Sequence, residues 1–201
     1  MPRVPSIFDP DFGSHTARVG APPPLGRGTG FLYVVARTNI VGGVDLGKSV
    51  LLIKEKRTNE WGAPGGMTDA TDHSPLHAAM REFSEEVGAD WRRLANGTQM
   101  IEFVRIRPAF GVPPTANESW GLLTGMSAQD IEALLFEDDR SKWPLSKRMN
   151  YRGAKDSAGY AIVPIADVLN ADPRTGAFKI GPNDQKLRDA RRTLEALINI
   201  P

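Results

Sequence analysis

The sequence predicts an α/β fold in which helices cover both faces of a mixed β-sheet. Runs of β-branched and aromatic residues alternate along the chain with segments whose apolar residues recur at helical spacing. This mixed order is typical of a layered α/β/α domain. The chain has 201 residues, 40% of them apolar, which suffices for one domain with a sizeable core and an extension.

Residues 1–29 are predicted to form a Pro/Gly-rich N-terminal arm, and residues 30–201 the folded domain. Six of the sixteen prolines lie in the arm, including the triplet Pro22-Pro23-Pro24. Because proline sustains neither a helix nor a central strand, we expect an extended segment here.

The first part of the domain is predicted to be β-structure. The runs over 31–37 and 49–57 are rich in β-branched and aromatic residues, and the glycines of 39–43 fit a hairpin between them. The second run becomes charged at its end, so this strand is expected to leave the core for the surface. A turn-rich segment at 59–66 follows.

A helix is predicted over residues 74–88. Ser74 is a suitable N-cap, Pro75 fits the first helical position and Gly88 fits the C-terminal stop. Its apolar residues fall within about 100° of one another on a helical wheel, which defines a core face. They are Leu76, Ala79, Met80, Phe83 and Val87.

Local signals predict the remaining elements. Residues 99–107 and 160–163 have the composition of strands. A serine caps a predicted helix over 127–136, a short helix is expected at 165–170, and apolar spacing predicts a closing helix over 183–199.

The composition excludes several classes of protein. The chain has no cysteine, which excludes disulfides, thiolate metal sites and cysteine nucleophiles, and its three histidines make a His-rich zinc centre improbable. With 25 Lys and Arg against 24 Asp and Glu, no global field attracts nucleic acid or a membrane surface. No apolar run approaches the roughly 20 residues of a membrane helix. We therefore expect a soluble, cytoplasmic protein.

Three carboxylates gather on a second face of the predicted helix. Glu82, Glu85 and Glu86 lie at i, i+3 and i+4, centred about 120° from the apolar face. Such close carboxylates repel one another unless a cation lies between them, and Arg81 can neutralise or orient one. A Pro-Gly-Gly turn ahead of the helix lets backbone carbonyls approach a metal ion. The set suits Mg²⁺ or Mn²⁺, whereas the alternative is a solvated acidic face.

The segment from Gly66 to Ala89 resembles the Nudix box. That pattern runs Gly, five residues, Glu, seven residues, then Arg-Glu-aliphatic-any-Glu-Glu-any-Gly-aliphatic. This chain supplies Gly66 and then Arg-Glu-Phe-Ser-Glu-Glu-Val-Gly-Ala from Arg81 onward. It departs from the pattern by one inserted residue in the loop and by Asp72 in place of the first Glu. On this resemblance the chain is identified as a Nudix hydrolase with a Nudix-like α/β/α sandwich.

The resemblance implies a pyrophosphohydrolase that acts on the phosphoric anhydride bond of a nucleoside diphosphate derivative. It implies a metal set for Mg²⁺ or Mn²⁺ that comprises Glu82, Glu85, Glu86 and the carbonyl of Gly65 or Gly66. Arg81 would orient Glu85, and a metal-activated water would attack phosphorus.

The general base stays open between two locations. Glu82 or Glu86 can serve from within the helix. Some members of the family place the base in a later loop, where the candidates here are Glu137, Asp138 and Asp139. The alternative for that loop is a solvated acidic turn.

Two basic groups are candidates for binding the substrate. The first comprises Lys54, Lys56 and Arg57, together with Arg105 and Arg107, whose alternate spacing puts that pair on one face of a strand. The second comprises Trp143, Arg148 and Arg152, in a segment that could hold a polyphosphate or stack a base. Ordinary solvated surface is the alternative for both.

Other functions stay open at this stage. The expected partner is a small diphosphate compound, with an RNA cap or an inositol pyrophosphate as the second choice. A homodimer is compatible with the sequence, and no membrane partner is expected. A ligand-binding module that has kept the fold and lost turnover is the alternative of a different class.

Overall fold

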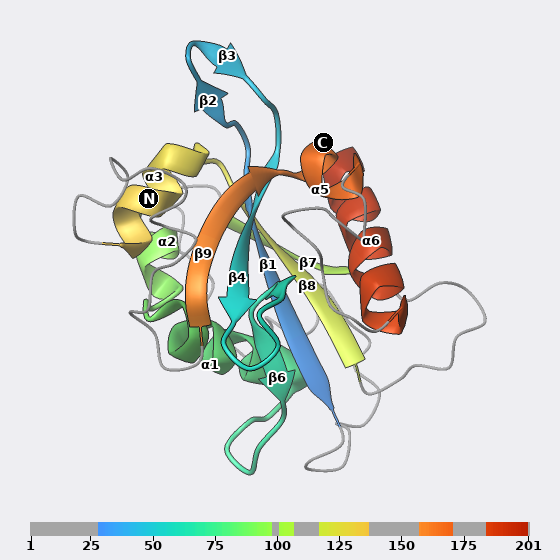
Figure 1. The fold of residues 1–201 in the computed structure, drawn as a ribbon. Helices are drawn as coiled ribbons and strands as arrows, with labels where there is room; N and C mark the ends of the chain where they lie inside the picture. The colour runs from blue at the N-terminus through green and yellow to red at the C-terminus, as the bar shows by residue number, and fades with distance from the viewer. Residues whose placement is uncertain (1–27, 98–100, 107–116, 137–156, 171–183, 201) are drawn as a thin grey trace.

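The protein is a mixed β-sheet with helices on both faces (Figure 1). The computed structural model describes residues 28–97, 101–106, 117–136, 157–170 and 184–200. The strands are β1 (Thr29–Ala36), β2 (Ile40–Val41), β3 (Val44–Asp45), β4 (Ser49–Glu55), β5 (Trp61–Gly62), β6 (Gly65–Met67), β7 (Ile101–Ile106), β8 (Asn117–Thr124) and β9 (Ser157–Pro164). The helices are α1 (Pro75–Val87), α2 (Arg92–Gly97), α3 (Ala128–Leu135), α5 (Ile165–Asn170) and α6 (Asp184–Asn199).

The main sheet joins strands that lie far apart in the sequence. β1 pairs in parallel with β8 along most of its length, and its end pairs antiparallel with the start of β4. β6 lies antiparallel beside the first residues of β1, where Phe31 faces Gly65 in the register. β7 extends the sheet beyond β8, and β9 pairs with β4. The parallel β1–β8 pair among antiparallel neighbours makes the sheet mixed.

Each face of the sheet has its own core. Successive residues of a strand point to opposite faces, so Leu32 and Val34 pack in the cluster formed with α1, α2 and α3. Tyr33 and Val35 pack instead in the cluster formed with α5 and α6. Figure 1 shows these two groups of helices on opposite sides of the sheet. The predicted α/β/α sandwich is thereby confirmed.

Most predicted elements are present, with ends shifted by a few residues. The strand expected over 49–57 ends at Glu55, and the strand expected over 160–163 begins already at Ser157. The chain reversal expected at 39–43 is a small hairpin of its own, β2–β3. Its turn residues Gly42 and Gly43 both have positive φ, as the tight two-residue hairpin turn requires.

Four elements have no counterpart among the predictions. They are β8, α2 and the short strands β5 and β6, which lie where only a turn-rich segment was expected. The sequence of β8, Asn-Glu-Ser-Trp-Gly-Leu-Leu-Thr, does not alternate in polarity and contains Gly121. The glycine has a packing reason, because a side chain there would overlap Leu197 of α6. β8 is a strand because it pairs with β1 on one side and with β7 on the other. Local sequence patterns do not reveal these pairings.

The arm expected at 1–29 lies, apart from Gly28 and Thr29, outside the described residues. No helix in the part of the chain that the structure describes is long and apolar enough to cross a membrane.

Candidate active site

Helix α1 is built as its sequence predicts. The Ser74 hydroxyl accepts a hydrogen bond from the His77 backbone N–H at 3.2 Å, and Pro75 takes the first helical position. Gly88 is in the left-handed region with φ 74°, and its N–H donates to the Ser84 carbonyl at 3.1 Å. All five predicted core residues of the helix are buried. The acidic face of the same helix is therefore held in a fixed orientation.

Two glycines let α1 approach the sheet closely. A side chain at Gly30 of β1 would overlap the Pro75 carbonyl, so the start of the helix lies directly on this strand. A side chain at Gly66 of β6 would overlap the Glu82 carboxyl group. The Glu82 carboxylate consequently lies against the bare backbone of the Pro-Gly-Gly turn.

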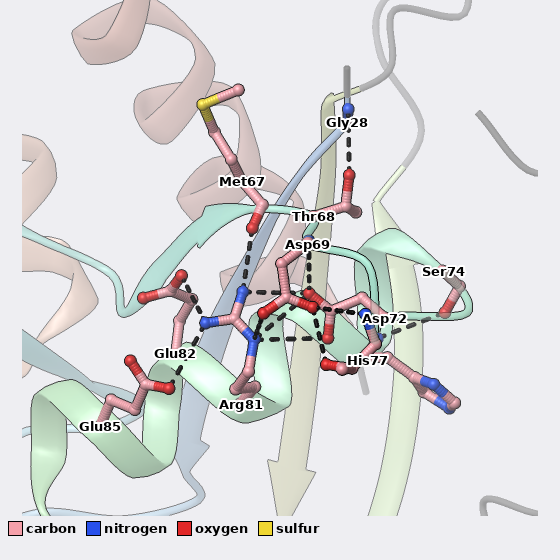
Figure 2. A network of polar contacts seen from close by, with 11 residues as sticks. Gly28, Met67, Thr68, Asp69, Asp72, Ser74, His77, Arg81, Glu82 and Glu85 are labelled. Carbon is pink, nitrogen blue, oxygen red and sulfur yellow. Dashed lines mark hydrogen bonds and ion pairs between the residues drawn. The ribbon is translucent and has the colours of Figure 1, made fainter. Parts of the chain in front are cut away.

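The Arg81 guanidinium connects the helix to the loop before it (Figure 2). Its Nη2 lies 3.0 Å from Asp72 Oδ2, and the Asp72 side chain is only 4% exposed. The same nitrogen donates to the Met67 carbonyl of β6 at 2.9 Å. Nε lies 3.4 Å from Asp69 Oδ2. The Arg81 side chain thus binds the loop near its start, at Met67 and Asp69, and near its end, at Asp72.

The same guanidinium contacts two of the three clustered glutamates. Arg81 Nη1 lies 2.9 Å from Glu82 Oε1 and 3.5 Å from Glu85 Oε1. The Glu82 side chain is 20% exposed and that of Glu85 46%. Arg81 therefore neutralises part of the charge that the glutamates would otherwise concentrate on one turn.

The loop that carries the extra residue closes on itself. The Asp69 carboxylate accepts hydrogen bonds from the backbone and the hydroxyl of Thr71, both at 2.7 Å. The Asp69 backbone N–H donates to Asp72 Oδ2 at 3.0 Å. This tight turn brings Asp72 to Arg81 despite the shorter side chain and the inserted residue. Hydrogen bonds from the Thr71 hydroxyl and backbone lower the pKa of Asp69.

The network keeps Arg81 charged. Burial lowers the pKa of Arg81, but its hydrogen bonds with Asp72 and Glu82 outweigh that effect, so the pKa lies above its ordinary value. In the first turn of α1, burial lowers the pKa of His77, and the nearby His73 ring adds to this effect.

Glu86 is held by a different group. Its carboxylate accepts a hydrogen bond from the Gly65 backbone N–H at 2.8 Å. Glu82 and Glu85 therefore share Arg81, whereas Glu86 is bound by the Gly65 backbone. Within the described residues, no three acidic or histidine side chains converge on one point as metal ligands would. The chemistry of the three glutamates nonetheless fits a hard divalent cation. They supply carboxylate oxygens beside a glycine backbone that leaves room for carbonyl ligands.

The predicted basic residues are only partly described. Lys54 Nζ lies 6.0 Å from the centroid of the Trp61 ring. Arg57 is 86% exposed in its side chain and lies 3.5 Å from Glu55, and Lys56 is exposed. Arg105 pairs with Trp120 in the β7–β8 register, so β1 and β8 lie between it and β4. Outside the described residues lie Arg107, Glu137, Asp138, Asp139, Trp143, Arg148 and Arg152.

Three contacts of Arg81 have no counterpart among the predictions, those to Asp69, to Asp72 and to the Met67 carbonyl. A backbone carbonyl has no signature in the sequence. The acidic pair Asp69 and Asp72 was the available signal for the loop, since both precede a helix that carries an arginine.

Solved structures of several proteins have a similar fold. One is a NUDIX hydrolase from Alicyclobacillus acidocaldarius, 17% identical over 87% of this chain and 92% of that one, with a TM-score of 0.48. A second is the C. elegans Ap4A hydrolase in a binary complex, 16% identical over 87% of this chain and 99% of that one, with a TM-score of 0.45. A third is the NUDIX domain of Shewanella oneidensis NrtR complexed with ADP ribose, 15% identical over 93% of this chain and 97% of that one, with a TM-score of 0.42.

A comparison of the sequence with models of protein families identifies the family of this chain. No match is found among curated proteins. The NUDIX domain model matches residues 36–138, just over half of the chain, and that range contains the whole of α1 and its loop. The chain therefore belongs to the NUDIX family and is a pyrophosphohydrolase of that family.

Proposed function

We propose that the protein hydrolyses the diphosphate linkage of a nucleoside diphosphate derivative with Mg²⁺ or Mn²⁺ bound at the polar face of α1. The observation that carries this proposal is the arrangement of that face. Three glutamates lie on one turn of a well-anchored helix, beside the glycine backbone of β6. Arg81 contacts two of them, and the Gly65 N–H donates to the third.

The proposed ligands are Glu82, Glu85, Glu86 and the carbonyl of Gly65 or Gly66. A divalent ion bound by these oxygens would neutralise the diphosphate and lower the pKa of the attacking water. The partly exposed Glu82 and Glu85 carboxylates now contact Arg81, so binding an ion requires them to exchange that partner or share it.

The residues of the chain contribute positioning and charge. Arg81 holds Glu82 and Glu85 on one side of the helix, and the Gly65 N–H holds Glu86, so little reorganisation is needed at the moment of reaction. Glu82 or Glu86 is the proposed proton acceptor for the attacking water. A base among residues 137–139 is the other arrangement that a test must distinguish.

Basic residues on the strand leading into the site are the proposed contacts to the substrate. Lys54 projects from the end of β4 next to Trp61 of β5, and Lys56 and Arg57 follow directly. Three positive charges in this short segment can hold the phosphates of a small diphosphate compound.

The proposal is tested by incubating the protein with Mg²⁺ or Mn²⁺ and a panel of diphosphate compounds. The panel contains nucleotide sugars, ADP-ribose, dinucleoside polyphosphates, nucleoside triphosphates, capped RNA and inositol pyrophosphates. We expect cleavage of a nucleoside diphosphate derivative that stops when the metal is chelated. Cleavage confined to capped RNA or inositol pyrophosphates would overturn the substrate class.

Glu85→Gln tests the site, and Glu195→Gln is its matched control. Both glutamates are exposed on a helix and paired with an arginine four residues earlier, Glu195 with Arg191 at 3.0 Å. We expect Glu85→Gln to lower kcat by about 10²-fold or more, since a group that stabilises charge in the reaction is lost. Glu195→Gln should leave kcat unchanged. Equal activity of the two variants would refute the assignment of Glu85.

A further inference from the structure

A hydrogen bond of Ser157 connects β9, which pairs with β4 in the sheet, to the end of α1. It is the first residue of β9 and is only 5% exposed. Its hydroxyl donates a hydrogen bond to the Glu86 carbonyl at 2.5 Å, across 71 positions of sequence. No pattern in the sequence signals this contact.

The bond satisfies a helix end that lacks partners of its own. The last four carbonyls of an α-helix have no intrahelical donor. In α1 the Ser84 carbonyl accepts the Gly88 N–H, whereas the Glu86 carbonyl accepts the Ser157 hydroxyl from another element. The final turn of α1 is therefore held by β9 as well as by its own cap.

An irregularity in β9 presents Ser157 to the helix. Along β4 and β9, Lys54 faces Gly159, but the next residue, Glu55, faces Ser157. The strand thus contains one extra residue at Ala158, which is a β-bulge. Bulges turn side chains out of the regular alternation and are frequent beside active sites.

Glu86 is consequently held at two points, through its main chain by Ser157 and through its carboxylate by the Gly65 N–H at 2.8 Å. The neighbouring Glu85 differs, with a side chain 46% exposed and a 3.5 Å contact to Arg81. The two constraints link β9, α1 and β6 through a single residue.

We propose that Ser157 is a positioning residue of this site, which holds the last turn of α1 so that the Glu86 carboxylate stays against Gly65. The catalytic part of this inference rests on the proposed function, because it requires Glu86 to belong to the reacting site. The structural part does not, and it can be measured without metal or substrate.

The first measurement is hydrogen exchange at the Gly65 amide by NMR in the metal-free protein. The variants are Ser157→Ala, which removes the hydroxyl, and Ser157→Thr, which keeps one. Thr124→Val is the matched control, since the buried Thr124 hydroxyl donates to the Val35 carbonyl at 3.0 Å near the other end of β1. We expect exchange about tenfold faster in Ser157→Ala, as for the loss of one hydrogen bond, and unchanged in the other two. Unchanged exchange in Ser157→Ala would overturn the inference.

The second measurement is the kinetics of the same variants together with their Mn²⁺ affinity. We expect Ser157→Ala to lower kcat about tenfold with KM changed less than twofold, to weaken Mn²⁺ binding, and to be rescued by Ser157→Thr. If Ser157→Ala and Thr124→Val lose stability alike and both keep kcat and Mn²⁺ affinity, the role of Ser157 is structural and the inference is wrong.

The two proposals fail in different ways. A wild-type protein that binds no Mn²⁺ and cleaves nothing in the panel refutes the proposed function. The Gly65 exchange rate still decides whether Ser157 positions Glu86, because it depends on neither metal nor turnover.

Discussion

Two polar networks lie at opposite ends of β1. One is centred on the charged side chain of Arg81 and the other on the neutral side chain of Asn39. At the start of the strand, Arg81 binds the buried carboxylate of Asp72 and three that are partly exposed, of which Asp69 is the most exposed at 50%. After the end of the strand, Asn39 is only 5% exposed. Its amide nitrogen donates to the Ser49 hydroxyl at 3.0 Å, and its amide oxygen accepts from Gln129 at 3.2 Å.

Both networks join segments that are distant in the sequence. The Asn39 network connects the β2–β3 hairpin, β4 and α3, with a further hydrogen bond from the Asn39 N–H to the Asp45 carboxylate at 3.1 Å. The Arg81 network connects β6, the loop after it and α1 (Figure 2). Each therefore holds a part of the fold in one orientation.

The difference in charge and burial suggests a structural role for the Asn39 network and a chemical role for the Arg81 network. Buried neutral amides and hydroxyls that satisfy one another specify a unique packing. Charged groups that remain in contact with solvent stay accessible to an ion of opposite charge, although water weakens the attraction. We therefore expect changes in the Arg81 network to affect both activity and stability, and changes in the Asn39 network to affect stability alone.

The largest expected effect is that of Arg81→Ala. The variant leaves the buried Asp72 carboxylate without its guanidinium, which should destabilise the protein by about 3 kcal/mol, as breaking a buried pair does, and abolish turnover. Denaturant unfolding and kcat are the measurements. Arg191→Ala, which breaks an exposed i,i+4 pair with Glu195, is the control and should cost less than about 1 kcal/mol. Similar losses in both variants would remove the distinction between the two ion pairs.

A smaller effect is expected for Asn39→Ala. The substitution removes the two hydrogen bonds of the Asn39 side chain, with Ser49 and with Gln129. We expect a cost of about 1–3 kcal/mol in the free energy of unfolding for the pair. The value of kcat should not change, because the network lies at the end of β1 away from α1. Activity that falls together with stability would show that the two ends of the sheet are coupled.

The smallest effect is expected for Asp69→Asn, and it depends on pH. Because the folded state lowers the pKa of Asp69 below its ordinary value of 3.8, the charge stabilises the protein fully above that value. The contribution is lost as the pH falls through the lower pKa of the folded state. Unfolding midpoints at neutral and acidic pH should therefore differ between wild type and variant only at the higher pH. Asn39→Ala is the control, with a deficit that does not depend on pH; a deficit in Asp69→Asn that persists in acid would contradict the role of the charge.

Local patterns predicted helix α1 and its two faces. Ser74, Pro75 and Gly88 act within one turn of the helix ends, and the apolar and acidic residues follow helical spacing, so each signal is contained in a short stretch of chain. The ends of β4 and β9 were less predictable, since pairing with a partner strand decides where a strand stops.

β8 was missed for the same reason. Its residues pack as a strand only because β1 and β7 lie on either side, and its Gly121 admits Leu197 of α6. The substrate residues expected on β4 and β7 illustrate a further limit. In the sheet, β1 and β8 lie between β4 and β7, and the spacing of residues along one strand does not reveal this order.

The sequence by itself determined the fold class, the anchored helix, the acidic turn with its arginine and the resemblance to the Nudix box. These follow from spacing over a few residues, where the geometry of one helix decides which side chains meet. The tertiary structure alone decided that Asp72 reaches Arg81 through the closed loop, that Gly66 lies against Glu82, and that Ser157 holds the end of α1. These contacts depend on how separate segments pack against one another.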